Sequence, residues 1–232
     1  MKVLTGYFHD FINLFFPEVC AGCGNSLFKN ETAVCTACIY RIPYTNFASD
    51  PENLVVRQLW GRFPFVQADA FLYFNKGGTV QNMMHELKYN NRPEVGYRLG
   101  ELYGSGLIKN PDWVHPDLII PVPLHPRKLK KRGYNQAEHI AQGISGATGI
   151  PTDNSLLIRR HETETQTRKS RYDRYKNMSA AFAVSDPTVV QNRHIMLIDD
   201  VITTGATFEG CAEALLQAEG CRISIAALAF SK

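Results

Sequence analysis

Long apolar runs, internal repeats and low-complexity segments are all missing from this sequence. No apolar run reaches the roughly 18 residues that a membrane-spanning helix needs, so we expect no membrane span. The apolar stretch from Phe11 to Phe16 is interrupted by Asn13, and no small-residue cleavage site follows it. We therefore expect no signal peptide and a cytoplasmic location.

The sequence also has little excess of either charge. The 25 Lys and Arg residues nearly balance the 22 Asp and Glu residues, and the net charge is +3. So small a net charge argues nothing about a nucleic-acid partner, and only local clusters of cations can carry that argument. The 232 residues, of which 44% are hydrophobic, leave room for one large domain and a small one.

The apolar pattern predicts an α/β fold over most of the chain. Short apolar runs indicate buried strands, and apolar residues at helical spacing indicate helices between them. Strands that alternate with helices imply a mostly parallel sheet flanked by helices on both faces. The predicted strands are 68–74, 118–122, 156–159, 195–198 and 223–230, and the predicted helices are 79–89, 93–107, 135–148 and 208–219.

The stretch from His194 to Thr207 carries the most informative motif. An apolar run ends in two acids, Asp199 and Asp200, and a loop of small residues leads into a helix-like segment. Open α/β sheets bind ligands beyond the carboxyl ends of their strands. Carboxylates there suit the vicinal hydroxyls of a ribose, whereas threonine hydroxyls, loop amides and a helix N-terminus suit a phosphate. Gly205 would let the loop backbone approach a ligand closely.

This segment closely resembles the motif with which type I phosphoribosyltransferases bind PRPP, the 5-phosphate 1-pyrophosphate of ribose. The resemblance rests on the apolar strand, the two acids and the sequence Thr203-Thr204-Gly205-Ala206-Thr207 together. An ordinary strand, turn and helix with solvated acids is the alternative.

Four of the six cysteines form two pairs, Cys20-x-x-Cys23 and Cys35-x-x-Cys38. Two such knuckles can direct four thiolates to one tetrahedral zinc ion, and closed sites of four cysteines are usually structural. Two disulfides or a redox pair are the alternatives, but nothing suggests export, and a redox pair would not explain the duplication. We predict a structural Zn²⁺.

The segment around these cysteines is too short to bury a core alone, so the metal would supply much of its folding free energy. Pro43 and the sequence Asp50-Pro51 mark a turn-rich exit from it. We predict a zinc-ribbon domain over residues 1–48 and the α/β domain over residues 49–232.

Two clusters of cations flank the acid pair in the sequence. The first, Arg127–Arg132, follows the strand 118–122, and five of its six residues are cationic. Its place after a strand predicts that it lies at the same edge of the sheet as the acids; a solvated loop or a nucleic-acid patch is the alternative. The second, 159–176, is polar throughout from 161 to 168, which is typical of a loop that closes over an active site. A plain charged loop is the alternative there.

Nearly the whole chain resembles the ComF family of amidophosphoribosyltransferase-like proteins. The resemblance implies a zinc-ribbon domain joined to a type I phosphoribosyltransferase domain. It also implies, in naturally transformable bacteria, a role with the DNA-uptake machinery in handling incoming single-stranded DNA. The matching residues are Cys20, Cys23, Cys35, Cys38, Leu-Lys-Tyr at 87–89, Pro-Val-Pro-Leu-His-Pro-Arg at 121–127, Lys-Arg-Gly-Tyr-Asn-Gln-Ala at 131–137, Arg160, Thr163, 165–167, Arg171, Arg174, Asn177, Phe182 and 199–207.

The resemblance assigns roles at the predicted site. Asp199 and Asp200 would hold the ribose hydroxyls and stabilise the cationic ring as pyrophosphate leaves, which makes them the predicted catalytic residues. Mg²⁺ would bridge sugar and pyrophosphate oxygens and keep several waters. We expect the acids to face a ligand crevice and not to form a structural ion pair. The predicted PRPP-binding residues are Leu124, His125, Arg127, Lys128, Arg168, Asp199, Asp200, Val201, Thr203, Thr204, Gly205, Ala206 and Thr207.

No motif for an acceptor stands out, so two functions stay open at this point. One is an enzyme that transfers the phosphoribosyl group to an unknown acceptor and releases pyrophosphate. The other is a non-catalytic adaptor for single-stranded DNA with a regulatory PRPP site, since Tyr134, Tyr172 and Tyr175 lie among cations and could stack on bases. The cations most relevant to DNA are Lys128, Lys130, Lys131, Arg132, Arg168, Lys169, Arg171 and Arg174. The sequence predicts no oligomeric state.

Overall fold

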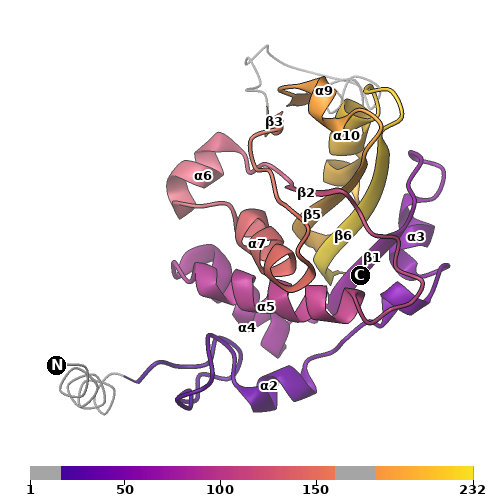
Figure 1. The fold of residues 1–232 in the computed structure, drawn as a ribbon. Helices are drawn as coiled ribbons and strands as arrows, with labels where there is room; N and C mark the ends of the chain where they lie inside the picture. Colours follow the sequence, from indigo (N-terminus) through magenta and orange to yellow (C-terminus); the bar gives the residue numbers. More distant parts are fainter. Residues whose placement is uncertain (1–16, 160–180, 232) are drawn as a thin grey trace.

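The computed structural model describes residues 17–159 and 181–231 (Figure 1). Its main sheet has four parallel strands in the order β1-β6-β5-β2. These are β1 (Ala68–Tyr73), β6 (Arg222–Phe230), β5 (His194–Ile202) and β2 (Leu118–Pro121). The predicted α/β class with a mostly parallel sheet is confirmed.

Both faces of the sheet are covered, and this is why its strands read as near-continuous apolar runs. Along β5, Met196 and Ile198 join one core cluster while Ile195 and Leu197 join the other, as the two-residue period of a strand requires. Helices α4 (Thr79–Tyr89), α5 (Pro93–Leu107) and α7 (Gln136–Thr148) cover the first face. Helices α3 (Leu54–Leu59) and α10 (Ala206–Leu215) cover the second.

The remaining elements are short. They are α2 (Thr36–Arg41), the 3-10 turn η1 (Phe47–Ser49), α6 (Pro126–Arg132), α9 (Pro187–Val190) and the antiparallel pair β3 (Leu157–Arg159) and β4 (Phe182–Val184). None of the helices in the described residues is long and apolar enough to cross a membrane.

Two boundaries differ from the prediction in a way that bears on the site. The strand expected at 195–198 runs on to Ile202, because residues 199, 201 and 202 keep their parallel pairing with β6. The two acids therefore belong to the strand and do not follow it. The helix expected at 208–219 begins at Ala206 and ends at Leu215, so it starts directly after Gly205.

The first cation cluster forms a helix, α6, and not a loop. The imidazole of His125 caps its start by accepting from the amide of Arg127 at 3.2 Å, Pro126 occupies its first position, and Gly133 ends it at φ 85°. None of its residues is buried, so the segment has no apolar period that would reveal a helix. Its last turn carries Lys130–Arg132, where cations interact favourably with the helix dipole.

The cysteine segment packs directly on α4. Cys20, Cys35 and Cys38 belong to the same apolar cluster as Met83 and Leu87 of that helix. A Cβ atom at Gly22 would lie 2.6 Å from the Thr79 side chain and 2.7 Å from that of Met83, so a larger residue there would displace these side chains of α4. The domain boundary at residue 48 stays a prediction.

Candidate active site and metal centre

Asp200 lies on the face of the sheet that α4 covers. Lys88, in the last turn of α4, donates from Nζ to Asp200 Oδ2 at 2.8 Å, and both side chains are less than one fifth exposed. The acids are expected from the sequence to face a ligand crevice and form no structural ion pair; Asp200 does form an ion pair, and both it and Lys88 line a cavity. The reason is tertiary, because the packing of α4 on the sheet brings its last turn over the carboxylate.

Asp199 behaves differently, since no cation of the described residues forms an ion pair with it. Its Oδ1 accepts from the backbone amide of Asp200 at 2.7 Å. Burial, and then the negative charge of Asp200, raise the pKa of Asp199 to about 7, while that amide and the cations Lys88 and Lys128 act in the opposite direction. Near neutral pH the Asp199 carboxyl is thus protonated in some molecules and ionised in others.

A polar cavity of about 140 Å³ opens beside the acid pair. Both carboxylates and Thr207 line it, and so do cations from separate elements: Lys88 of α4, Lys128 and Arg132 of α6, and Arg159 of β3. Arg132 is held in place by donating to the side-chain oxygen of Gln136 at 2.7 Å. An arrangement of several cations around two carboxylates suits a ligand that carries both hydroxyls and a polyanionic group.

The predicted site residues divide into those that line this cavity and those that do not. Leu124, Lys128, Asp199, Asp200 and Thr207 line it. Among the described residues, His125, Arg127, Val201, Thr203, Thr204, Gly205 and Ala206 do not, and His125 caps α6. Arg168 and the rest of the predicted closing loop, with Tyr172 and Tyr175, lie outside the described residues.

Three cations of the cavity are not among the predicted PRPP-binding residues. Lys88 stands in the Leu-Lys-Tyr segment that resembles the ComF family, and Arg132 and Arg159 stand at the edges of the two basic clusters. That resemblance was a usable signal for Lys88. No local pattern shows which cations of a basic cluster face the cavity, because this depends on the residue at which α6 begins and on how the helix is oriented against the sheet.

The threonine loop connects β5 to the start of α10. Thr203 and Thr204 are exposed, and Gly205 is buried at φ 76° as the residue that precedes the helix. A Cβ atom at Gly205 would lie 2.5 Å from the Leu59 side chain of α3. Gly205 is therefore needed for its left-handed backbone and for contact with α3, reasons other than the predicted approach of a ligand.

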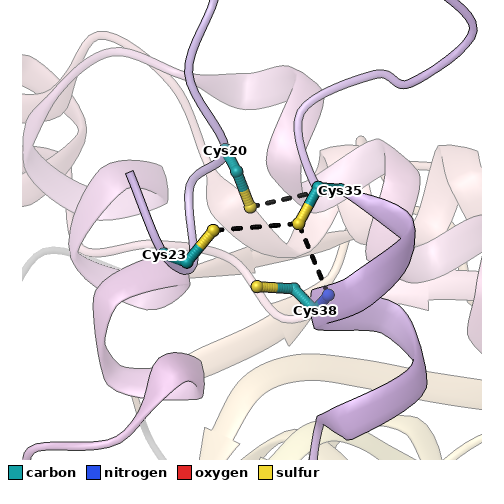
Figure 2. A group of neighbouring side chains, drawn as sticks. All are labelled: Cys20, Cys23, Cys35 and Cys38. Carbon is teal, nitrogen blue, oxygen red and sulfur yellow. Dashed lines mark hydrogen bonds between the residues drawn. The ribbon is translucent and has the colours of Figure 1, made fainter. Parts of the chain in front are cut away.

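The four N-terminal cysteines converge on one point (Figure 2). Their Sγ atoms all lie within 4.8 Å of one another, and those of Cys23 and Cys35 are 3.7 Å apart. Ligands 2.3 Å from a tetrahedral zinc ion would be about 3.8 Å apart, so the donor set fits zinc. All six cysteines of the chain are free, so neither pair forms a disulfide.

Backbone amides stabilise thiolates at this centre. Cys20 Sγ accepts from the amide of Cys35 at 3.2 Å and from that of Gly22 at 3.4 Å. Burial acts to raise the pKa of Cys20, but these amides and that of Cys23 together bring it down to about 7. Burial raises the pKa of Cys38. A bound zinc ion would offset that burial, because its charge favours the thiolate form.

Comparisons with known proteins bear on the second half of the chain in particular. The family model of the phosphoribosyl transferase domain matches residues 107–232, more than half of the chain. The DNA utilization protein YhgH of Escherichia coli O157:H7 is 33% identical over 138 residues, which are 58% of this chain and 60% of that protein. Competence protein F of Haemophilus influenzae is 39% identical over 101 residues, 43% of this chain and 44% of that protein.

Competence protein ComFC of Bacillus subtilis is 31% identical over 146 residues, 60% of this chain and 56% of that protein. The names of these relatives confirm the resemblance to the ComF family. The chain spans less than two thirds of the length of each of these three relatives.

Proposed function

Since the chain belongs to the phosphoribosyl transferase domain family, we propose that it binds PRPP and transfers the phosphoribosyl group to an acceptor, with release of pyrophosphate. The observation that carries this proposal is the cavity in which the two acids of β5 meet cations from α4, α6 and β3. PRPP has the matching chemistry, with ribose hydroxyls and a pyrophosphate on adjacent carbons.

Charge development explains what these residues would do. When pyrophosphate leaves C1, positive charge grows on the ribose ring and negative charge grows on the leaving group. Asp199 and Asp200 would accept hydrogen bonds from the ribose hydroxyls and stabilise the ring cation. Lys128, Arg132 and Arg159 would hold the leaving pyrophosphate. Catalysis would consist mostly of positioning and electrostatic stabilisation.

The ion pair between Lys88 and Asp200 gives the site a further property. Without ligand it neutralises one of two adjacent carboxylates, which would otherwise repel each other. With ligand, Lys88 lies close enough to the cavity to contact an anionic group, and Asp200 becomes available to a ribose hydroxyl.

The donor set also fits a magnesium ion. Asp199 and Asp200 offer carboxylate oxygens, the kind of ligand that Mg²⁺ takes in proteins together with substrate phosphates. Bound Mg²⁺ would neutralise charge on the pyrophosphate while keeping several waters.

Pyrophosphate release tests the transferase directly. The protein would be incubated with PRPP, Mg²⁺ and a panel of amines, nucleobases and related acceptors, and pyrophosphate would be measured. We expect release that depends on an acceptor and that the Asp199→Asn, Asp200→Asn double variant lacks. No release with any acceptor, together with unchanged PRPP binding in that variant, would contradict the proposal.

A second function is favoured by surface features. Two aromatic side chains of the cysteine segment, Phe28 and Tyr40, are 79% and 87% exposed, and Lys130 and Lys131 of α6 are exposed outside the cavity. Aromatic faces and cations together suit single-stranded nucleic acid. In this alternative the protein is a DNA-handling adaptor with a regulatory PRPP site, as the names of its relatives suggest. PRPP binding without turnover would favour the adaptor.

A further inference from the structure

The threonine loop is held from behind by the segment that contains α3. Gln58 of α3 donates from its amide to the carbonyl oxygen of Thr203, and Arg62, just beyond α3, donates to the carbonyl oxygen of Thr204. The same guanidinium of Arg62 pairs with Glu209 Oε2 at 2.5 Å. These contacts join residues 58–62, which precede the matched family region, to the loop at the end of β5.

The two carbonyl contacts decide where the loop amides point. A trans peptide is planar, and its N–H points opposite to its C=O. No cis peptide occurs in the described residues. Because the carbonyls of Thr203 and Thr204 are directed to Gln58 and Arg62, the following amides, those of Thr204 and Gly205, are directed away from α3. A phosphate bound at the loop needs amides with that orientation.

The ion pair between Arg62 and Glu209 also removes a source of repulsion at the N-terminus of α10. Glu209 lies in the first turn of α10 with a side chain only 12% exposed. A carboxylate there is favoured by the helix dipole, but it would repel an anion that binds at the same helix N-terminus. Arg62, with a side chain 27% exposed, neutralises that carboxylate.

We propose that Arg62, held by Glu209, is a positioning residue that orients the threonine loop for the 5-phosphate of the ligand without touching it. This inference rests on the proposed function, because it concerns the same PRPP site. Gln58 assists by fixing the other carbonyl. Removing either member of the Arg62–Glu209 pair releases the loop, so both single changes have the same consequence.

Calorimetry with separate parts of the ligand tests the assignment. Wild type, Arg62→Gln and Glu209→Gln would be titrated with PRPP, ribose 5-phosphate and magnesium pyrophosphate. We expect each variant to lose roughly tenfold or more in affinity for PRPP and ribose 5-phosphate, since hydrogen bonds to charged groups have this strength. Pyrophosphate affinity should not change, because Lys128 and Arg132 are untouched. The double variant should bind no more weakly than the weaker single variant.

Two controls separate positioning from other effects. Arg57→Gln alters an exposed arginine of α3, which pairs with the exposed Glu52, and should change no affinity. Hydrogen exchange of the amides at 203–206 should become faster in Arg62→Gln and Glu209→Gln even without ligand. Arg62→Lys keeps the charge but cannot bind the carbonyl and the carboxylate at once with the fork of a guanidinium. We therefore expect its affinity for ribose 5-phosphate to lie between those of Arg62→Gln and the wild type.

The outcomes are distinguishable. If Arg62→Gln binds ribose 5-phosphate as the wild type does, the inference is wrong. If Arg62→Gln loses affinity while Glu209→Gln keeps or gains it, Arg62 contacts the phosphate directly, and the positioning role is wrong. If the wild type binds neither PRPP nor ribose 5-phosphate, the proposed function fails. Independently of that result, equal hydrogen exchange of the amides at 203–206 in the wild type and both variants would reject the positioning role.

Discussion

The two candidate ligand sites of this chain are assembled in opposite ways. All four thiolate donors come from residues 20–38, and two amides of the same segment, those of Gly22 and Cys35, donate to Cys20. The acid site draws instead on α4, α6, β3, β5 and α10, and α3 holds its loop. A site built from one short segment depends on local turns and on its metal, whereas a dispersed site depends on the packing of the whole sheet.

Helix α4 connects the two sites. Its first turns pack against Gly22, whose carbonyl accepts from the side chain of Asn82 at 2.9 Å. Its last turn carries Lys88 to Asp200, and the carbonyl of Leu87 accepts from the hydroxyl of Tyr134. Loss of the cysteine segment would therefore remove one support of the helix that brings Lys88 to the acids, while its packing on α5 would remain.

The largest expected effect follows from removing a metal ligand. Cys35→Ser should abolish stoichiometric zinc binding and unfold the cysteine segment, because structural zinc sites supply roughly 10–16 kcal/mol of binding free energy. The four-stranded sheet should persist, since none of its strands belongs to that segment. Elemental analysis would measure zinc, and circular dichroism would measure the sheet.

Cys221→Ser is the matched control, because Cys221 is buried but lies outside the cysteine group. It should keep its zinc. Global collapse of Cys35→Ser would mean that the cysteine segment and the sheet form one folding unit, as their shared apolar cluster allows, and the predicted boundary at residue 48 would be wrong.

The next largest effect concerns the dispersed site. The Asp199→Asn, Asp200→Asn double variant should lose roughly 3–6 kcal/mol of PRPP binding free energy, since each charged hydrogen bond contributes roughly 1.5–3 kcal/mol. Zinc content should not change, which separates the two sites. Calorimetry with PRPP and Mg²⁺ would measure the loss. Unchanged affinity would refute the assignment, and a much lower melting temperature would indicate a structural role for the acids.

The contrast between the sites also explains what the sequence could predict. The cysteine pairs and the strand that ends in acids are continuous in the sequence, so spacing and apolar runs reveal them. The contacts of Lys88 with Asp200 and of Arg62 with Thr204 join residues far apart in the chain, and no local pattern encodes them. Helix α6 was not predicted because it buries no side chain and so has no apolar period, although Pro126 and Gly133 at its ends were recognisable signals.

A smaller effect concerns pH and a single carboxyl of the dispersed site. The pKa of Asp199 is raised from 3.8 to about 7, so the folded state holds this proton more tightly than the unfolded state. The resulting stability is fully present below pH 4 and is lost as the pH rises through about 7. Asp199→Asn should make the unfolding free energy less dependent on pH in that window, by roughly 1.4 kcal/mol per pH unit. Urea unfolding at several pH values would measure this.

Asp69 offers a matched control for that experiment. Burial raises its pKa to about 7 as well, against the hydrogen bond from Tyr103, and it does not line the acid cavity. Asp69→Asn should flatten the pH dependence in the same way and leave PRPP affinity unchanged. If neither substitution alters the pH dependence, these carboxyls ionise near their ordinary pKa, and the burial argument fails.

The smallest expected effect concerns single-stranded DNA and the two sides of α6. Lys128 and Arg132, one helical turn apart, line the acid cavity, whereas Lys130 and Lys131 do not. If the protein handles DNA, Lys130→Ala with Lys131→Ala should weaken DNA binding and leave PRPP affinity unchanged. The slope of log K for DNA against log salt concentration should become shallower by about 0.7 for each DNA phosphate that the variant no longer neutralises.

The inner pair should behave in the opposite way. Lys128→Ala with Arg132→Ala should weaken PRPP binding, and DNA should compete with PRPP only through this second pair. Titration of a labelled oligonucleotide at low and moderate salt would measure both effects. Absence of binding even at low salt would reject the adaptor function, because the attraction between cations and phosphates is strongest when the fewest counterions compete for it.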